Sequence, residues 1–299
     1  MIDNPFRSMI RAEGVRLYRD LPWRRTRDPY VIWLSEVMLQ QTQVPRVLDR
    51  MPAWLERFPS VAHLAQAPTA DVLAAWQGMG YNRRALSLHA AARMLMDDFD
   101  GVFPQDAKEL QSLPGVGPAT AQGIRSFAFD LPGVYLETNV RTVFLHHYFP
   151  DAEGVSDKEL VPLVEAACPD APGAAEPGVY AQPMDAKDTP RAWYYALLDY
   201  GAYLKKSVPN PSRRSRGYAK QSKFEGSRRQ KRAELVRALL ARHDEGLDGL
   251  LLAEAVEHLN AVEAAAGRKS VDETLVRDIL NALVNEGFCV YRDGCWFIA

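Results

Sequence analysis

Helical periodicity is the feature that most limits how this chain can fold. In successive segments of the first 205 residues, apolar side chains recur three to four positions apart, and Pro, Gly or Asp separates one segment from the next. This is the spacing of amphipathic helices that bury one face. The clearest segments are residues 30–51, 70–79, 84–99, 139–149 and 191–204. The pattern predicts an all-helical domain over residues 1–205.

The C-terminal part has a different order of elements. Residues 228–243, 252–267 and 271–287 predict three helices, and FCVYRDGCWFIA, residues 288–299, predicts two short strands joined by a turn at Asp293 and Gly294. Three helices followed by a hairpin is winged-helix order. We therefore predict a mainly α protein with domains at 1–205 and 228–299, joined by a basic linker or DNA-binding arm at 206–227.

Composition excludes several classes of protein. The 299 residues include no run of eighteen apolar positions and no N-terminal leader pattern, so we expect no membrane segment and a cytoplasmic location. The three cysteines, Cys168, Cys289 and Cys295, are scattered, which fits a reducing compartment without a disulfide framework and makes a poor metal site.

Charge is distributed unevenly. The net charge is only −2, yet residues 205–232 hold eleven Lys or Arg and a single acid, Glu225. Such a segment favours binding to a polyanion or an acidic surface, although a disordered linker would have a similar composition. A Pro/Gly/Ala-rich stretch at 170–190 predicts a surface loop.

An acid lies within an apolar helical pattern in WLSEVMLQQTQV, residues 33–44. On a continuous helix, Glu36, Gln40 and Gln43 would lie within about 60° of one another and form a polar stripe. Partial burial would raise the pKa of the Glu36 carboxyl group and suit it to general acid catalysis near neutral pH. The alternative is that Glu36 faces solvent or caps a neighbouring helix.

Two glycine turns indicate possible nucleic-acid contacts. In LPGVGPATA, Gly115 and Gly117 allow a tight turn whose exposed amides suit a phosphate, although a plain helix–turn–helix corner would use the same residues. In WQGMGYNRRA, Tyr81 with Arg83 and Arg84 could stack on a base and hold its phosphates. The alternative is a packing tyrosine beside two surface arginines.

A second acid follows an apolar run in VYLETNVRTVF, residues 134–144. Thr138 or Asn139 could simply cap the helix that begins there. Glu137 would lie at the same helix N-terminus, where the helix dipole favours an ionised carboxylate. A protonated Glu36 and a charged Glu137 would resemble the pair of carboxyl groups that cleaves glycosidic bonds.

The order of these motifs resembles the helix-hairpin-helix DNA glycosylase superfamily, most closely its adenine DNA glycosylases. The resemblance covers roughly residues 15–205 and rests on SEVMLQQTQV, WQGMGYNRRA, LPGVG and an acid-x-Asn-Val-Arg run. It implies a helix-hairpin-helix DNA glycosylase fold followed by the winged-helix-like module.

The resemblance also implies roles for individual residues. Glu36 matches the general acid that protonates the base, Glu137 falls where the family has a catalytic aspartate, and Asn139 matches its companion asparagine. Contacts to DNA are implied or expected for Leu39, Gln40 and Gln41 as a wedge, Tyr81 as an intercalating side chain, Leu113, Gly115, Val116 and Gly117 as the hairpin, and Arg83, Lys220, Lys223 and Arg228 as basic contacts.

The chain departs from the family pattern at several points. Ala119 stands where strand-nicking relatives carry a lysine, so we expect no lyase activity. The segment 209–226 lacks the cysteines of the family's iron–sulfur motif, so we expect no cluster, no metal and no other cofactor. The Nudix-like domain is replaced by the winged-helix-like module, and Glu137 is one methylene longer than aspartate.

We predict a monofunctional DNA glycosylase of base excision repair that removes adenine mispaired with 8-oxoguanine or guanine. Its expected partner is double-stranded DNA, with no membrane, and the expected state is a monomer associated with the nucleoid. One alternative is a glycosylase of the same superfamily for another damaged or mismatched base. The other is a DNA-binding protein without catalysis, although a second acid at 137 argues against it.

Overall fold

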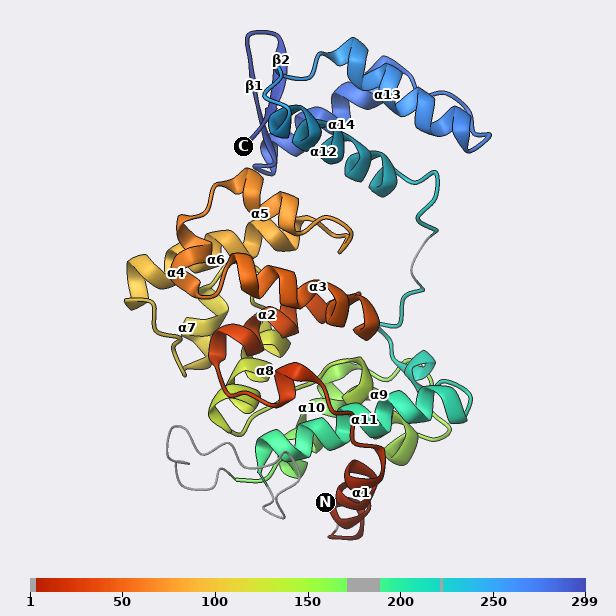
Figure 1. The fold of residues 1–299 in the computed structure, drawn as a ribbon. Coiled ribbons are helices and arrows are strands. Elements are labelled where there is room, and N and C mark those ends of the chain that lie inside the picture. Colours follow the sequence, from red (N-terminus) through yellow and green to blue (C-terminus); the bar gives the residue numbers. More distant parts are fainter. Residues whose placement is uncertain (1–3, 171–188, 221–222) are drawn as a thin grey trace. The chain divides into compact units, whose positions relative to one another are not determined.

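The computed structural model describes residues 4–170, 189–220 and 223–299, and these residues are mainly helical (Figure 1). The surface loop predicted at 170–190 falls almost entirely outside them. The chain divides into two compact units, one of residues 1–40 with 102–220 and the other of residues 41–101 with 221–299. Each unit is therefore built from two separate stretches of the sequence.

The first unit is organised around one long helix, α11 (Pro190–Ser207), which packs against α1 and α9. A second helix pair, α2 with α8, contributes to the same unit. The remaining elements are α1 (Asn4–Leu17), η1 (Pro22–Arg24), α2 (Pro29–Leu39), α7 (Ala107–Ser112), α8 (Pro118–Phe129), α9 (Thr138–Tyr148), α10 (Asp157–Ala167) and η2 (Pro211–Arg214).

Aromatic side chains of α11 fill the core of the first unit. Tyr195 stacks on Phe127 of α8 with ring centroids 4.4 Å apart, and Tyr194 meets Tyr135 edge to face at 5.3 Å. Helices α9 and α11 approach closely at Gly201, where a Cβ atom would lie only 2.7 Å from the carbonyl carbon of Asn139. Glycine is required there because any side chain would separate the two helices.

A buried ion pair ties α11 to the chain before α2. The guanidinium of Arg24 donates two hydrogen bonds to the carboxylate of Asp199, at 2.7 and 2.8 Å, and both side chains are 1% exposed. The backbone amide of Arg19 also donates to Asp199, at 3.1 Å. This network fixes the segment that leads into α2, the helix that carries Glu36.

The second unit combines a helical cluster with the C-terminal module. In the cluster, α6 packs against α4 and α5, and Trp54 meets Trp76 edge to face at 5.3 Å. The elements are α3 (Val44–Arg57), α4 (Val61–Gln66), α5 (Thr69–Ala75), α6 (Arg83–Phe99), α12 (Arg228–Asp244), α13 (Leu252–Ala265), α14 (Glu273–Asn285), β1 (Cys289–Arg292) and β2 (Cys295–Ile298).

The C-terminal module has the predicted winged-helix order. Strands β1 and β2 pair antiparallel, with Cys289 opposite Ile298 and Arg292 opposite Cys295. Asp293 and Gly294 adopt φ angles of 52° and 81°. Two successive positive φ angles define the turn that matches the twist of a two-residue hairpin. The predicted hairpin is confirmed.

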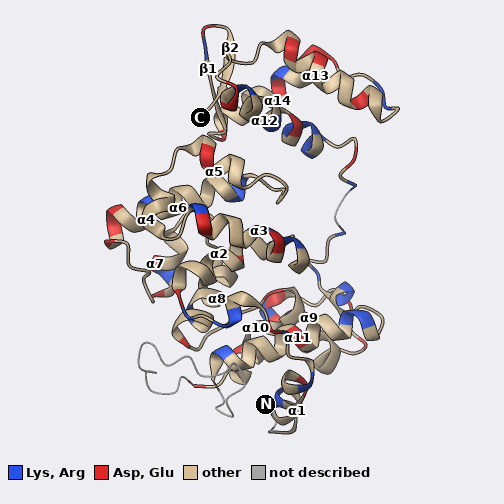
Figure 2. Ribbon diagram, viewed as in Figure 1, with Lys and Arg blue, Asp and Glu red and all other residues tan. Residues whose placement is uncertain are grey.

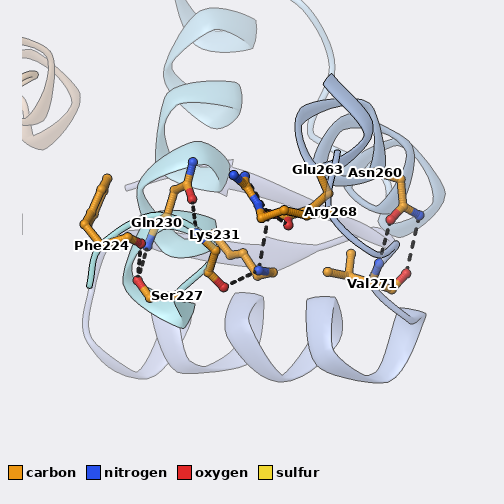
Figure 3. Close-up of polar contacts among 9 residues, drawn as sticks. Phe224, Ser227, Gln230, Lys231, Asn260, Glu263, Arg268 and Val271 are labelled. Atoms are coloured by element: carbon orange, nitrogen blue, oxygen red, sulfur yellow. Dashed lines mark hydrogen bonds and ion pairs between the residues drawn. The ribbon is translucent and has the colours of Figure 1, made fainter. Parts of the chain in front are cut away.

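An ion-paired cluster holds the start of α12 inside this module (Figure 3). The Lys231 ammonium lies 3.2 Å from Glu263 of α13 and donates to the carbonyl of Gly226 at 2.8 Å. Arg268 also pairs with Glu263, at 2.6 Å. Lys231 and Glu263 are both buried, so each charge is compensated within the module.

Two expectations from the sequence need correction. Residues 30–51 do not form one helix: α2 ends at Leu39, Gln41 has a φ of 53°, and α3 begins at Val44. The break falls at Gln40 and Gln41, and Pro45 lies in the first turn of α3, where a missing amide hydrogen is tolerated. The predicted polar stripe of Glu36, Gln40 and Gln43 is therefore wrong.

The basic segment 206–227 is also less extended than a linker. It begins inside α11, and η2 follows with Pro211 and Ser212 buried. The Ser212 hydroxyl hydrogen-bonds to that of Thr142 on α9 at 2.8 Å, and residue 215 forms a β-bridge with Val155. Part of the segment is thus packed on the first unit.

The buried ion pair provides a test of the first unit. Replacing Asp199 with Ala leaves the Arg24 guanidinium buried without its carboxylate, which should lower the free energy of unfolding by about 3–5 kcal/mol. The matched control is Asp20→Ala, because Asp20 pairs with Arg25 at the surface, where the side chains are 55% and 64% exposed. That change should cost below about 1 kcal/mol. Urea denaturation of both variants measures the difference, and equal losses would contradict the expectation.

Candidate active site

Glu36 lies on the side of α2 that packs against α8. The helix begins where the Asp28 side chain accepts a hydrogen bond from the amide of Tyr30 at 2.9 Å, and Pro29 occupies its first turn. Glu36 itself is half-buried. On α8, a Cβ atom at Gly123 would lie 2.8 Å from Cδ of Glu36 and closer still to Oε2. The missing side chain at Gly123 therefore provides the space for the carboxyl group.

The Glu36 carboxyl group has one hydrogen-bond partner with defined geometry. The hydroxyl of Tyr135 donates to Oε2 of Glu36 at 2.9 Å. Tyr135 is itself buried and is packed edge to face against Phe127 at 5.2 Å. Its backbone amide donates to the hydroxyl of Tyr194 at 3.2 Å, and that hydroxyl donates to the carbonyl of Gly133. Tyr135 is thus fixed by both its ring and its backbone.

Burial raises the pKa of Glu36 to about 8. The hydrogen bond from Tyr135 acts in the opposite direction because it stabilises the carboxylate, and the negative charge of Glu137 adds to the increase. At neutral pH the group is therefore mostly a neutral carboxylic acid with a proton to donate. This is the direction of the shift that the sequence predicts.

Glu137 caps the N-terminus of α9. Its Oε1 accepts hydrogen bonds from the amides of Asn139 and Val140, the latter at 3.0 Å, and its Oε2 accepts one from Nδ2 of Asn139 at 3.3 Å. The N-cap is thus Glu137, the residue before the two candidates that the sequence offered for that role. The interaction between the charges of Glu137 and Glu36 shows that α2 and α9 bring the two acids together.

The pKa of Glu137 differs from the expectation. Burial raises it, while the amides of Val140 and Asn139 and the charges of Lys205 and Arg141 act to lower it. The helix dipole favours an ionised carboxylate, but burial, which the sequence does not reveal, has the larger effect here. The pKa values of both acids are raised, and the acids differ in their hydrogen-bond partners. Glu36 accepts from a phenol, whereas Glu137 accepts from backbone amides.

Asn139 carries an uncompensated polar atom at the same place. Its Nδ2 donates to Glu137, whereas its Oδ1 is buried and lacks a hydrogen-bond partner among the described residues. Buried polar atoms are rarely left without a partner in folded proteins. Asn139 is held in position because its backbone lies against Gly201 of α11.

Two residues of the site, Tyr135 and Gly123, were not among those predicted from the sequence. A signal for Tyr135 was present, because residues 135 and 137 would lie on the same face of an extended segment. No comparable signal exists for Gly123, because its role depends on the distance between α2 and α8.

The glycine turn between α7 and α8 has the predicted helix–hairpin–helix geometry. Leu113 and Val116 are buried and anchor the turn, while Gly115 and Gly117 are exposed. Gly115 has a φ of 78°, and a side chain at Gly117 would meet open space. The turn therefore presents bare backbone at the N-terminus of α8, where amides favour an anion.

The predicted wedge lies at the end of α2. Leu39 is the last residue of that helix and is half-buried, and Gln40 donates through Nε2 to the hydroxyl of Thr120 at 3.2 Å. Gln41, an exposed residue in the left-handed region, belongs to the second unit.

The turn at Tyr81 lies in the second unit. Tyr81 is half-buried with a φ of 48°, and Arg83 is exposed. Arg84 is not a surface charge: it is 9% exposed and donates to the carbonyls of Met79 and Gly80 at 3.1 and 2.9 Å. Burial lowers its pKa to about 10. Arg84 therefore holds the turn that presents Tyr81.

The remaining predicted basic residues, Lys220, Lys223 and Arg228, are exposed. Basic residues also occur along α12 (Figure 2). The cysteines are free, and the described residues contain no group of three or more His, Cys, Asp or Glu that could hold a metal ion. Within the same described residues, no helix has both the length and the apolar character needed to span a membrane.

Known proteins are similar to this chain in sequence. Residues 34–165 match the family of HhH-GPD superfamily base excision DNA repair proteins. An adenine DNA glycosylase of Mycobacterium tuberculosis is 35% identical over 287 residues, which cover 91% of each chain. One from Buchnera aphidicola is 38% identical over 130 residues, 44% of this chain and 37% of the relative.

Solved structures agree with this assignment. The structure of a thermostable thymine-DNA glycosylase has a TM-score of 0.54 and 25% identity, covering 66% of this chain and 85% of the other. An endonuclease III–DNA complex, 18% identical with a TM-score of 0.50, shares the fold. The fold, the family match and the relative that covers 91% of the chain define a helix-hairpin-helix protein of base excision repair. The chain belongs to the adenine DNA glycosylase family and is a DNA glycosylase.

The titration of Glu36 can be measured directly. We expect the carboxyl carbon of Glu36, followed by NMR and assigned with Glu36→Gln, to titrate near pH 8. Tyr135→Phe removes the donor that stabilises the carboxylate, so the pKa should rise further. The control is Tyr218→Phe, which changes a tyrosine that is 45% exposed. A Glu36 pKa near its ordinary value, or one unchanged by Tyr135→Phe, would refute this description of the site.

Proposed function

We propose that the chain hydrolyses the N-glycosidic bond of adenine mispaired with 8-oxoguanine or guanine, with Glu36 as the general acid. The observation that carries the proposal is the half-buried Glu36 carboxyl group, protonated at neutral pH and held by Tyr135, with its pKa raised further by the charge of Glu137. The relatives over most of the chain are named adenine DNA glycosylases, which supports adenine as the base.

The proposed reaction begins with proton transfer from Glu36 to a ring nitrogen of adenine. The bond between the sugar C1′ and the base then breaks, and its electron pair leaves with the neutral base. A cationic, oxocarbenium-like sugar remains. Water adds to C1′ and its proton passes to a carboxylate, so that the products are free adenine and an abasic site.

Tyr135 determines which oxygen of Glu36 donates in this scheme. Because the phenol donates to Oε2, the acidic proton belongs on Oε1, the oxygen left for the base. The same hydrogen bond keeps the carboxyl group in one rotamer before the nucleotide arrives. Such preorganisation matters because a misplacement of about 1 Å can lower a rate roughly a hundredfold.

Glu137 is proposed to stabilise the sugar cation. Its Oε1 is occupied by the amides of Asn139 and Val140, whereas Oε2 has only the longer contact to Asn139, at 3.3 Å. Oε2 is thus the oxygen available to the sugar. The extra methylene of glutamate is accommodated because the side chain folds back to cap α9. The unpaired Oδ1 of Asn139 would accept a hydrogen bond from the water or the nucleotide.

The proposed DNA contacts are made by residues of both units. The amides at Gly115 and Gly117 would bind backbone phosphates, with Leu113 and Val116 as their anchors. Leu39, Gln40 and Gln41 would occupy the space of the extruded nucleotide, and Tyr81 would stack on a base. The exposed residues Arg83, Lys220, Lys223 and Arg228 would contribute charge along the phosphates.

We further propose that the chain acts without an iron–sulfur cluster and as a monomer. The segment 209–226 has no cysteine, and where it packs on α9 it does so through Pro211 and the Ser212 hydroxyl. These residues offer no thiolate, and cysteine thiolates are the ligands that a cluster needs.

A second candidate function is excision of another mismatched or damaged base. Glu137 favours it, because the longer acid in place of aspartate indicates a pocket with altered dimensions.

Base release provides the main test. Single-turnover assays with alkali treatment would compare adenine opposite 8-oxoguanine, adenine opposite guanine, and a panel of other lesions. Glu36→Gln should slow excision by about 10²–10⁴, the usual contribution of general acid catalysis. The matched control is Glu153→Gln, an exposed acid of the first unit, which should keep the wild-type rate.

The pH dependence gives an independent readout of the same residue. A general acid works while protonated, so the rate should fall as pH rises through about 8, the pKa of Glu36. Tyr135→Phe should move that fall to higher pH. Cleavage only at another lesion would support the second candidate, and binding without any cleavage would reject the enzymatic proposal.

The absence of lyase activity is tested by borohydride trapping. Ala119 cannot form a Schiff base, so the wild-type chain should yield no trapped covalent complex with DNA. A lysine with a lowered pKa, Lys205, interacts with the charge of Glu137, and burial is the main cause of its shift. A trapped complex that disappears in Lys205→Gln would overturn the monofunctional assignment and identify the nucleophile.

A further inference from the structure

An arginine of the winged-helix-like module lies against the tyrosine that we expect to stack on a base. Arg229, at the start of α12, donates through Nη1 to the hydroxyl of Tyr81 at 2.7 Å. Its guanidinium carbon lies 5.7 Å from the centroid of the Tyr81 ring and 6.0 Å from that of Phe224. Both distances are within the range of cation–π attraction. One guanidinium group therefore links two aromatic rings.

We propose that Tyr81, Phe224 and Arg229 form a single DNA-binding platform, through which the winged-helix-like module contacts DNA with the start of its first helix. The inference rests on the proposed function only for the choice of DNA as the ligand. It does not depend on which base is excised.

The platform is exposed on the Phe224 side. The Phe224 side chain is 46% exposed, so its ring is open to a ligand. Exposed charges lie near the platform residues in the sequence: Lys223 and Glu225 flank Phe224, Arg228 precedes Arg229, and Arg83 follows Tyr81 by two positions. Aromatic rings interleaved with arginines and lysines are the combination that binds unstacked bases together with their phosphates.

The platform is also rigid, although it lies at the surface. The Ser227 hydroxyl donates to the carbonyl of Phe224 at 2.6 Å, and the amide of Gln230 donates to that hydroxyl at 3.3 Å (Figure 3). Lys231 holds the carbonyl of Gly226. On the other side, Arg84 fixes the turn that presents Tyr81. Preorganised side chains lose little entropy when a ligand binds.

The third helix of the module is a poor alternative for DNA. In helix–turn–helix proteins a recognition helix enters the major groove. Here α14 and the residue before it expose Asp272, Glu273 and Asp278, and Arg277 is paired with Glu273. These acids would repel phosphates. Charge therefore favours the start of α12 over α14 as the DNA-binding face.

DNA binding by the full chain tests the proposal. Fluorescence anisotropy would measure affinity for a fully paired duplex and for the same duplex with a tetrahydrofuran abasic analogue, neither of which contains a mispaired adenine. Phe224→Ala and Arg229→Gln should each weaken binding to the kinked analogue duplex roughly tenfold, the effect expected for loss of one stacking contact. Arg229→Gln should also lower the slope of log affinity against log salt concentration by about one, the value for loss of one phosphate contact.

The matched control is Arg277→Gln, which removes an exposed arginine from α14 of the same module and should leave binding unchanged. The double variant Tyr81→Phe with Arg229→Gln should lose less binding free energy than the sum of the losses in the two single variants. The reason is that both substitutions remove the same hydrogen bond. Thermal melting would verify that each variant is folded.

Wild-type affinity in both Phe224→Ala and Arg229→Gln would overturn the proposal. A loss of DNA affinity in Arg277→Gln as large as that in Arg229→Gln would also overturn the proposal and assign DNA binding to α14. Because neither duplex is a substrate, failure of adenine excision would leave these results interpretable, and failure of the platform would leave the catalytic proposal intact.

Discussion

Burial of one carboxyl group is the constraint on which the site depends. Packing against α8 removes water from the Glu36 carboxyl group, and this desolvation raises its pKa to about 8. The group is therefore protonated at neutral pH and can act as an acid. Gly123 leaves the space that this requires, and Tyr135 directs a hydrogen bond to one of the two oxygens. The aromatic core from α8 and α11 keeps Tyr135 in place. Packing of the aromatic core around Tyr135 thereby controls the chemistry of the carboxyl group.

The second acid is stabilised differently. Glu137 is half-buried as well, but two backbone amides at the start of α9 and the charges of Lys205 and Arg141 oppose the increase in its pKa. A phenol gives Glu36 a single donor, whereas the helix terminus gives Glu137 several. Unequal hydrogen bonding can therefore assign different roles to two glutamates whose charges interact.

Several structural features could be predicted from residues alone because they depend on local geometry. The hairpin at Asp293 and Gly294 follows from residues that tolerate positive φ, and the turn at Gly115 is similar. The break after Leu39 was missed because apolar periodicity continues past it, although Pro45 was a signal. Arg84 was expected either to hold a phosphate or to be a surface charge, whereas its guanidinium binds backbone carbonyls inside a turn, an interaction that no periodicity shows.

The sequence by itself determined the helical class, the glycine turn, the C-terminal winged-helix order and the two acids, because each depends on residue type and short-range spacing. Only the tertiary structure decided that Glu36 and Glu137, a hundred residues apart, interact, that Tyr135 is the donor to Glu36, and that Arg229 contacts Tyr81. These relationships depend on the distances between helices. Packing of the whole core sets those distances, and they leave no pattern in a single sequence.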